Sequence, residues 1–242
     1  SIQCMRGIKC MSKSKSYKLL LPLSPLLVPI VIYEPCVFIF VLGGATGIGY
    51  AIAKAFGEHG AKVAIAARRE NVINDAVAKL RDFGIDAFGT RVDVRDSKLC
   101  IQTVQTVFDH FGRIDYLVNN AAGNFVTSLE SLTPNGFATV LGIDLQGVLH
   151  MSKAVLPFMK RTSITEGACI INITATLQDI VTPFQAHAAA AKAGIDVLTD
   201  TMGVEWGEYN IRTIGLAPGG IAGTVGGPGG RVFGNNENNA AA

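Results

Sequence analysis

Short, continuously apolar runs alternate with longer amphipathic stretches along most of this chain. The apolar runs are residues 37–42, 62–66, 87–92, 116–119, 168–173 and 211–216. Continuous runs of this length are typical of strands that are buried on both faces of a parallel sheet. Stretches with helical spacing lie between them, at residues 48–59, 70–83, 97–111, 134–159 and 185–209. This alternation predicts an α/β fold of three αβα layers, a doubly wound parallel sheet or Rossmann fold.

Local signals predict where several of these helices begin and end. We expect Ser97 to cap the helix that follows it, because its hydroxyl can accept a hydrogen bond from a free backbone N–H group. Pro134 suits the first position of the next helix. Pro157 is expected to bend or end that helix in its last turn, because proline has no backbone N–H group to donate.

The two ends of the chain differ from its middle. Residues 1–18 are basic and residues 19–33 are almost purely apolar, which resembles a signal or anchor segment. The apolar run is shorter than the ~20 residues of a membrane-spanning helix and contains prolines. We therefore interpret residues 1–35 as an extension of uncertain status, with targeting or anchoring as the alternative, and expect no membrane partner. Residues 225–242 are expected to be flexible, which leaves one domain at residues 36–224.

Composition excludes several classes of protein. The 242 residues are 49% hydrophobic and 17% charged, with a net charge of +2. This balance argues against a disordered chain and against a nucleic-acid partner. The five cysteines and four histidines show no metal-ligand spacing, so we expect reduced thiols and no metal site.

A glycine-rich turn joins the first predicted strand to the first predicted helix. It reads Gly43-Gly44-Ala45-Thr46-Gly47-Ile48-Gly49. Glycines permit a tight turn and a close approach of the backbone to phosphate groups. The amino end of the helix adds free N–H groups and a positive dipole. Because the turn lies between a strand and a helix, it predicts a dinucleotide site rather than a plain turn.

Two arginines follow the second predicted strand and indicate which dinucleotide binds. A carboxylate at this position would bond the ribose hydroxyls of NAD. The chain has Arg68 and Arg69 there instead, and guanidinium groups form charge-assisted hydrogen bonds with a 2′-phosphate. We therefore predict NADPH/NADP+ as the cofactor, with a solvated basic turn as the alternative.

These motifs together resemble the short-chain dehydrogenase/reductase family over residues 37–224. The resemblance adds Asp93-Val94, Asn119-Asn120-Ala121-Ala122-Gly123 and Pro218-Gly219 to the glycine-rich turn. It implies that Asp93 and Val94 lie beside the adenine and that Asn120 and Ala121 support the cofactor. It also implies that the loop from Pro218 through Gly219 to Ile221 packs near the nicotinamide. Family members continue past this loop with further helices and a strand, so we expect the fold to lack these last C-terminal elements.

The chain departs from the usual family active site at three positions. Lys192 occupies the lysine position of the family's Tyr-x-x-x-Lys motif, but Ala188 stands where the tyrosine is expected. Ala175 occupies the serine position and Asp144 the asparagine position. An ordinary carbonyl reductase needs a phenol to give a proton to the developing alkoxide. The usual carbonyl chemistry is therefore not expected here.

The departures are similar to those of one branch of the family, the peroxisomal 2,4-dienoyl-CoA reductases. The shared stretches are Ala121-Ala122-Gly123-Asn124-Phe125, Thr133-Pro134-Asn135-Gly136-Phe137, Asn172-Ile173-Thr174-Ala175-Thr176-Leu177, His187 with Ala190-Ala191-Lys192-Ala193, and Val204-Glu205-Trp206-Gly207. This resemblance implies reduction of a 2,4-dienoyl-CoA to a 3-enoyl-CoA by NADPH, in the β-oxidation of unsaturated fatty acids. It also implies a peroxisomal location and a homo-oligomer, although the chain ends without Ser-Lys-Leu.

The same resemblance assigns the catalytic positions. Asp144 and Lys192 would hold the water that supplies a proton, and Lys192 would also bind the nicotinamide ribose. The alternatives are an internal hydrogen-bond partner for Asp144 and a surface position for Lys192. His187 is interpreted as a structural histidine with satisfied hydrogen bonds, in preference to an acid.

The predicted substrate contacts follow the fourth strand and the basic turns. Asn124 is expected to contact the thioester, and Phe125 and Asn135 to line the acyl path. Arg95 and Arg68 are candidates for the CoA phosphates. Two other functions stay open: a short-chain reductase for 3-oxoacyl or ketone substrates, and a truncated nucleotide-binding chain without activity.

Overall fold

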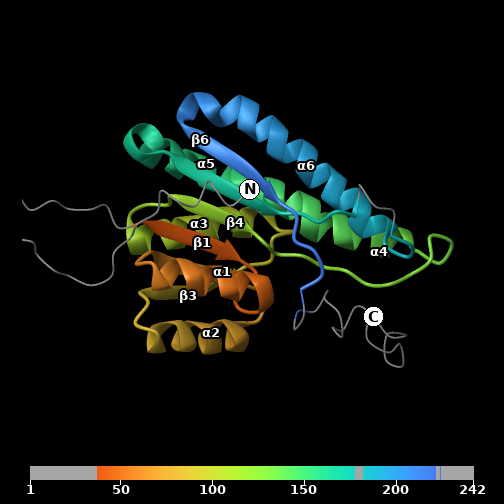
Figure 1. The fold of residues 1–242 in the computed structure, drawn as a ribbon, viewed down its shortest axis with the longest axis horizontal. Helices are drawn as coiled ribbons and strands as arrows, with labels where there is room; N and C mark the ends of the chain where they lie inside the picture. The colour runs from red at the N-terminus through yellow and green to blue at the C-terminus, as the bar shows by residue number, and fades with distance from the viewer. Residues whose placement is uncertain (1–36, 178–181, 222–223, 225–242) are drawn as a thin grey trace, which may run out of the picture.

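The computed structural model describes residues 37–177, 182–221 and 224 (Figure 1). The strands are β1 (Phe38–Leu42), β2 (Lys62–Ala67), β3 (Ala87–Arg91), β4 (Tyr116–Asn119), β5 (Ala168–Ile173) and β6 (Ile211–Leu216). The helices are α1 (Gly47–Glu58), α2 (Glu70–Asp82), α3 (Ser97–Phe111), α4 (Pro134–Leu141), α5 (Gly147–Glu166) and α6 (Ala186–Trp206). A π-helical turn, η2 (Gly142–Gln146), joins α4 to α5, and a 3-10 turn, η3 (Gly207–Tyr209), follows α6. The predictions for residues 1–35 and 225–242 lie outside the described residues.

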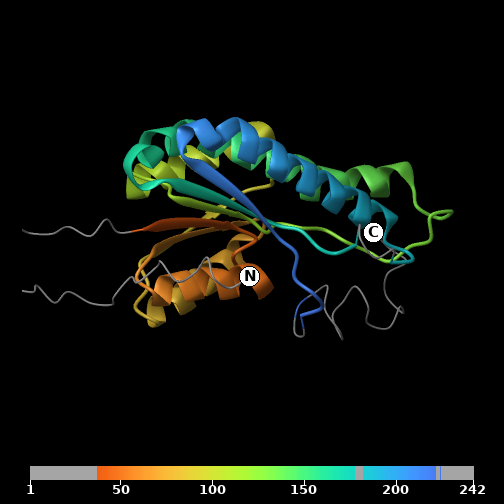
Figure 2. The same ribbon diagram turned by 45° about the horizontal axis from the view of Figure 1, so that its top comes forward.

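All the strands are parallel and lie in the order β3-β2-β1-β4-β5-β6. The order reverses between β1 and β4, which is the switch point where doubly wound sheets bind ligands at the carboxyl ends of their strands. Helices α3, α5 and α6 form the layer on one face, and α1 and α2 lie against the other (Figure 2). The predicted Rossmann fold is therefore confirmed.

The central strand β1 shows why a continuous apolar run is required. All five of its side chains are buried. Phe38 and Phe40 pack toward α3 and α5, whereas Ile39 and Val41 pack toward α1 and α2. A polar side chain at any of these positions would lose its hydration without gaining a partner.

One face of β6 has no helix over it in the described part of the chain. Ile214 and Leu216 pair with Ile171 and Ile173 of β5. The side chains of these two β5 residues lie on the face of the sheet that α1 and α2 cover. The exposed fractions of Ile214 and Leu216 are 41% and 48%. Among the described residues, β6 is therefore an edge strand with one uncovered face.

A chain of buried polar side chains fixes the layers that carry the site. Asn119 on β4 donates to Ser152 on α5 at 3.0 Å and to Asn172 on β5 at 2.8 Å. Asn172 in turn donates to Thr199 on α6 at 2.8 Å. Because all four side chains are buried, this network holds α5 and α6 in fixed register against the sheet.

Three predicted helix boundaries are wrong. The cap of α3 is Asp96 rather than Ser97, because the Asp96 carboxylate accepts from the N–H groups of Lys98 and Leu99. The long helix predicted at 134–159 is divided into α4, η2 and α5. It also continues past Pro157 to residue 166, because this proline is exposed while its neighbours anchor the helix in the core.

Neither a membrane-spanning helix nor a metal-binding cluster occurs among the described residues. None of the helices there combines the length and the apolar character that crossing a bilayer requires. No cluster of three or more His, Cys, Asp or Glu side chains suitable for a metal ion is found among them.

Candidate active site

The glycine-rich turn adopts the conformation that a phosphate site requires. Gly43 and Gly47 have φ values of +63° and +56°, in the left-handed region that favours glycine. A Cβ atom on Gly49 would overlap the Asn120 side chain and the Gly43 carbonyl. A Cβ on Gly44 would lie 2.7 Å from the side chain of Ile65. Glycines therefore let the turn pack closely where β1 enters α1, and the free N–H groups at the start of α1 fit a dinucleotide pyrophosphate.

Asn120, which follows the neighbouring strand β4, holds this turn in place. Its amide lies 3.2 Å from the carbonyl oxygens of both Leu42 and Gly43. Thr46 precedes α1 without a side-chain cap, so its hydroxyl does not occupy the free N–H groups of the first turn. The remaining predicted members lie beside them, with Ala45 buried and Ile48 and Ala121 half-buried.

The predicted adenosine end lies at the ends of β2 and β3. The exposed Arg68 is held through its backbone, because Arg91 Nε donates to its carbonyl oxygen at 3.2 Å. The Arg95 guanidinium forms a two-pronged pair with Asp93, at 3.0 and 2.6 Å. This hydrogen bond holds the pKa of the Asp93 carboxyl below its usual range. Val94 is buried beside them.

The loop that follows β6 returns toward the glycine-rich turn. Pro218, Gly219 and Ile221 precede Thr224, whose hydroxyl donates to the Ile221 carbonyl at 2.8 Å. The Thr224 methyl group lies 3.9 Å from the position that a Cβ of Gly47 would occupy. The structure thus brings the end of this loop beside the predicted pyrophosphate position.

The buried pair of Asp144 and Lys192 forms the centre of the site. Asp144 lies in the π-helical turn η2 and Lys192 on α6, with 3.3 Å between Nζ and Oδ2. The Gly123 N–H donates to Asp144 Oδ1 at 2.7 Å, and Lys192 donates to the Ile173 carbonyl at 3.1 Å. Both side chains are buried, so the alternative of a surface lysine is wrong.

Opposing effects set the protonation of this pair. Burial raises the pKa of the Asp144 carboxyl, and the Lys192 ammonium and the Gly123 N–H oppose that rise. A buried carboxyl with a raised pKa beside a cation is a common arrangement where a proton is held and transferred. Ala188, at the expected tyrosine position, is buried and brings no proton donor.

A loop after β4 connects Asp144 to the start of α6. The Asn124 amide donates to Gln185 Oε1 at 2.5 Å, and its own oxygen accepts from the Phe125 N–H at 2.9 Å. The Phe125 ring stacks on His187, with 4.3 Å between ring centroids. The structure thus places Asn124 and Phe125 one and two residues after Gly123, whose N–H donates to Asp144. Asn135 lies farther out, exposed in the first turn of α4.

Two residues of this region differ from the sequence prediction. His187 is fully buried, and neither ring nitrogen forms a hydrogen bond of regular geometry with a described residue; only the Phe125 backbone makes a weak polar contact, so the prediction of a fully satisfied histidine is wrong. Burial lowers the pKa of this imidazole, which is therefore neutral at neutral pH. Gln185 was not predicted to contribute, although its position two residues before His187 is a usable signal. Arg91 was also not predicted from the sequence, because only the pairing of β3 with β2 brings Arg91 beside Arg68.

Comparison with known proteins identifies similar chains. A family model described as short chain dehydrogenase matches residues 37–227. The Arabidopsis thaliana protein named peroxisomal 2,4-dienoyl-CoA reductase [(3E)-enoyl-CoA-producing] is 47% identical over 192 residues, which cover 77% of this chain and 64% of that protein. The protein of the same name from Pongo abelii is 40% identical over 188 residues, covering 77% and 63%. The chain therefore spans less than two thirds of the length of these relatives.

Solved structures agree with these matches. A short chain dehydrogenase from Bacillus anthracis has a TM-score of 0.72 and 35% identity, and the match covers 76% of each chain. A structure titled NAD+-bound xylitol dehydrogenase has a TM-score of 0.72 and 29% identity, covering 76% of this chain and 70% of that one.

Proposed function

The chain belongs to the short-chain dehydrogenase family, and on that premise we propose that it reduces 2,4-dienoyl-CoA thioesters to 3-enoyl-CoA with NADPH. The observation that carries the proposal is the buried Asp144–Lys192 pair beside an alanine at the tyrosine position. The names of the relatives from Arabidopsis thaliana and Pongo abelii support the same substrate class. The family and the NAD+-bound neighbour support a nicotinamide cofactor.

A conjugated thioester explains why a phenol is dispensable. The bound nicotinamide supplies a hydride, which adds at the far end of the diene. Negative charge then moves along the conjugated system to the thioester oxygen, and a proton must reach the carbon next to the carbonyl. The protein has to stabilise that oxyanion and deliver a proton to carbon, neither of which requires a tyrosine at position 188.

The central pair can perform both tasks. The Lys192 ammonium places positive charge in a buried site, where it stabilises a developing oxyanion more strongly than it would in water. Asp144 and Lys192 together can hold a water molecule and pass its proton to carbon. Gly123 and Ile173 fix the two charged groups through backbone hydrogen bonds, so little reorganisation is needed during the reaction.

The substrate contacts extend this proposal outward from the centre. Asn124 and Phe125 lie at the carboxyl edge of the sheet, where the thioester and the acyl chain would pass. Asn135, in the first turn of α4, would line the outer part of that path. Arg68 and Arg95 supply positive charge for the CoA phosphates. The hydrogen bonds from Arg95 to Asp93 fix the orientation of the Arg95 guanidinium.

We also propose a setting for the enzyme, by resemblance to the named relatives. The names of these relatives support the peroxisome, and we extend the proposal to the β-oxidation of unsaturated fatty acids and to assembly as a homo-oligomer.

The proposed activity predicts a clear substrate preference. With 2,4-hexadienoyl-CoA, NADPH oxidation should exceed that with a 3-oxoacyl-CoA by roughly 100-fold in kcat/KM, because no phenol protonates an alkoxide. Absorbance of reduced nicotinamide measures both rates. A preference for the ketone would show an ordinary short-chain reductase. Cofactor binding without turnover of either thioester would show a nucleotide-binding chain.

Cofactor choice is predicted to depend on Arg68. Arg68→Ser should weaken NADPH binding by about 10- to 100-fold and leave NADH binding unchanged, because a charge-assisted hydrogen bond to the 2′-phosphate is lost. Calorimetric titration measures both dissociation constants. Arg161→Ser is the matched control: Arg161 is also exposed, lies on α5, and its replacement should alter neither constant. Equal affinity of the unaltered protein for the two cofactors would contradict the prediction.

A further inference from the structure

Two buried side chains at the start of α6 carry polar atoms that form no regular hydrogen bond. Neither nitrogen of the His187 imidazole, nor Gln185 Nε2, forms a hydrogen bond of regular geometry with a described residue, and the Phe125 backbone makes only a weak polar contact with the ring. The exposed fractions of the two side chains are 0% and 1%. The nearby polar groups of Asn124 and Asp144, in contrast, have partners.

Such an arrangement requires an explanation. A buried donor or acceptor without a partner destabilises the folded state, so native proteins leave few of them. Replacing His187 by an apolar ring of similar size would remove this cost. A binding role explains why polar atoms stand there, because a ligand that reaches them would supply the missing hydrogen bonds.

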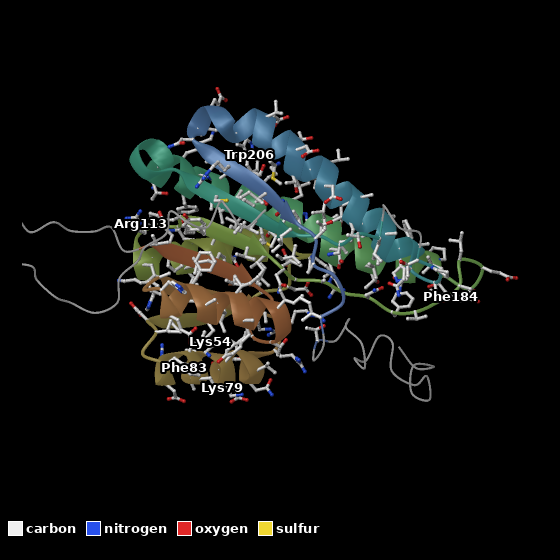
Figure 3. The ribbon with its side chains drawn as sticks, viewed as in Figure 1. Lys54, Lys79, Phe83, Arg113, Phe184 and Trp206 are labelled. Carbon is white, nitrogen blue, oxygen red and sulfur yellow. The ribbon has the colours of Figure 1, made fainter. Side chains whose placement is uncertain are left out.

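The two side chains lie where a substrate would enter. Figure 3 shows Phe184, which lies just before α6, and Trp206, the last residue of α6, at opposite ends of that helix. Gln185 and His187 lie one and three residues after Phe184. The carboxyl ends of the strands point toward this same end of the molecule (Figure 1). The loop after β4 crosses here, because the Thr127 N–H donates to the Phe184 carbonyl at 3.2 Å. The region is thus part of the edge where doubly wound sheets bind ligands.

His187 is linked to the central pair through the loop after β4: the Gly123 N–H donates to Asp144, and Phe125, two residues later, stacks on His187. The Asp144 carboxylate favours the charged form of the imidazole, and the imidazolium would in turn favour the charged form of Asp144. Burial outweighs this attraction and keeps the ring neutral. A neutral imidazole has one N–H donor and one acceptor nitrogen, which suits it to bind a carbonyl oxygen.

The chemistry of the proposed substrate identifies the group that these atoms would meet. The proton delivered at Asp144 and Lys192 goes to the carbon next to the thioester carbonyl. In that part of the molecule the carbonyl oxygen is the strong hydrogen-bond acceptor, since the acyl chain is hydrocarbon. A donor close to Asp144 is therefore close to this oxygen.

We propose that His187 donates a hydrogen bond to the thioester oxygen of the bound acyl-CoA, with the Gln185 amide as a second donor; this rests on the function proposed above. The half-buried Phe125 ring covers one face of the imidazole in the structure and moves aside when the acyl chain enters. The imidazole thus supplies the oxyanion contact that the absent phenol at position 188 cannot supply.

The decisive variant is His187→Phe, which keeps an aromatic ring against Phe125 but removes both nitrogens. We expect kcat/KM for 2,4-hexadienoyl-CoA to fall about 100-fold, as when one oxyanion donor is lost. NADPH affinity should stay within about twofold, and Tm should rise by roughly 2–6 °C because unpaired buried nitrogens are removed. His187→Gln, which retains an N–H donor, should recover at least about 10-fold of the lost kcat/KM.

The matched control is His110→Phe. His110 also stacks on a phenylalanine, with 4.4 Å between its ring centroid and that of Phe88, but it lies at the end of α3. This variant should keep full activity. If His187→Phe also keeps kcat/KM within about threefold, or if His187→Gln is as impaired as His187→Phe, the role of His187 is structural and the proposal is overturned.

A binding measurement separates this proposal from the function on which it rests. Calorimetric titration of the NADP+ complex with 2,4-hexadienoyl-CoA and with free CoA needs no turnover. His187→Phe should weaken binding of the thioester about 10-fold and leave that of free CoA unchanged. Absence of turnover by the unaltered protein would refute only the proposed function. Equal weakening for the thioester and free CoA, or none for either, would refute the role of His187.

Discussion

Lys192→Met is expected to lower kcat for dienoyl-CoA reduction by about 1000-fold or more. The substitution removes the positive charge nearest to the developing oxyanion and one of the two groups that hold the proton-donating water. It also breaks the hydrogen bond from Lys192 to the Ile173 carbonyl. Steady-state kinetics with saturating NADPH measure the effect. Lys153→Met, on an exposed lysine of α5, is the matched control and should keep full activity.

The same variant should be destabilised in a pH-dependent way. Loss of Lys192 leaves Asp144 as an uncompensated buried charge, which costs roughly 3–5 kcal/mol of unfolding free energy at neutral pH. Burial already raises the pKa of Asp144, and removal of the ammonium raises it further. The folded state then binds a proton that the unfolded state releases above its pKa of about 3.9, so stability falls as pH increases from that value through the folded-state pKa.

A second substitution tests whether Asp144 causes this loss. In the double variant Lys192→Met, Asp144→Asn, the carboxyl group is absent, so the fall in stability with pH should disappear. Urea unfolding at pH 4 and pH 7 provides the comparison. If Lys192→Met is equally stable at both pH values, or if the double variant keeps the pH dependence, the charge of Asp144 is not responsible.

The sheet could be predicted from the sequence because its strands are buried on both faces. The runs at 37–42 and 211–216 differ from β1 and β6 by one residue or none. The helix boundaries depend on finer geometry. Asp96 and Ser97 are both good capping residues, and only the backbone conformation decides that Asp96 accepts the hydrogen bonds. The π-helical turn leaves no signal in apolar spacing, yet it carries Asp144.

The candidate site could be predicted only in part. The juxtaposition of Asp144 and Lys192 followed from positions that match a family pattern, and the structure brings them within 3.3 Å. The state of His187 could not be predicted, because a lack of partners depends on every neighbouring side chain. Residue type alone favoured a satisfied histidine. The sequence therefore failed to predict a residue such as His187, whose state depends on its buried surroundings and not on the spacing of a sequence motif.

Gly49→Ala is expected to weaken NADPH binding by at least about 100-fold. The new Cβ would overlap the Asn120 amide and the Gly43 carbonyl, so the turn and the first turn of α1 must separate. Asn120 then loses its hydrogen bonds to the carbonyl oxygens of Leu42 and Gly43, which hold the cradle in shape. The N–H groups at the amino end of α1 would no longer converge on the pyrophosphate.

The control for this variant is Gly207→Ala. Gly207 begins η3 with an ordinary helical backbone, and a Cβ there meets no atom within 4 Å. Alanine should be tolerated or slightly stabilising at this position, because it restricts the unfolded chain. Fluorescence titration with NADPH and thermal unfolding compare the two variants. Unchanged NADPH affinity in Gly49→Ala would show that the close approach at this turn does not shape the cofactor site. Loss of affinity in both variants would indicate general sensitivity to alanine instead.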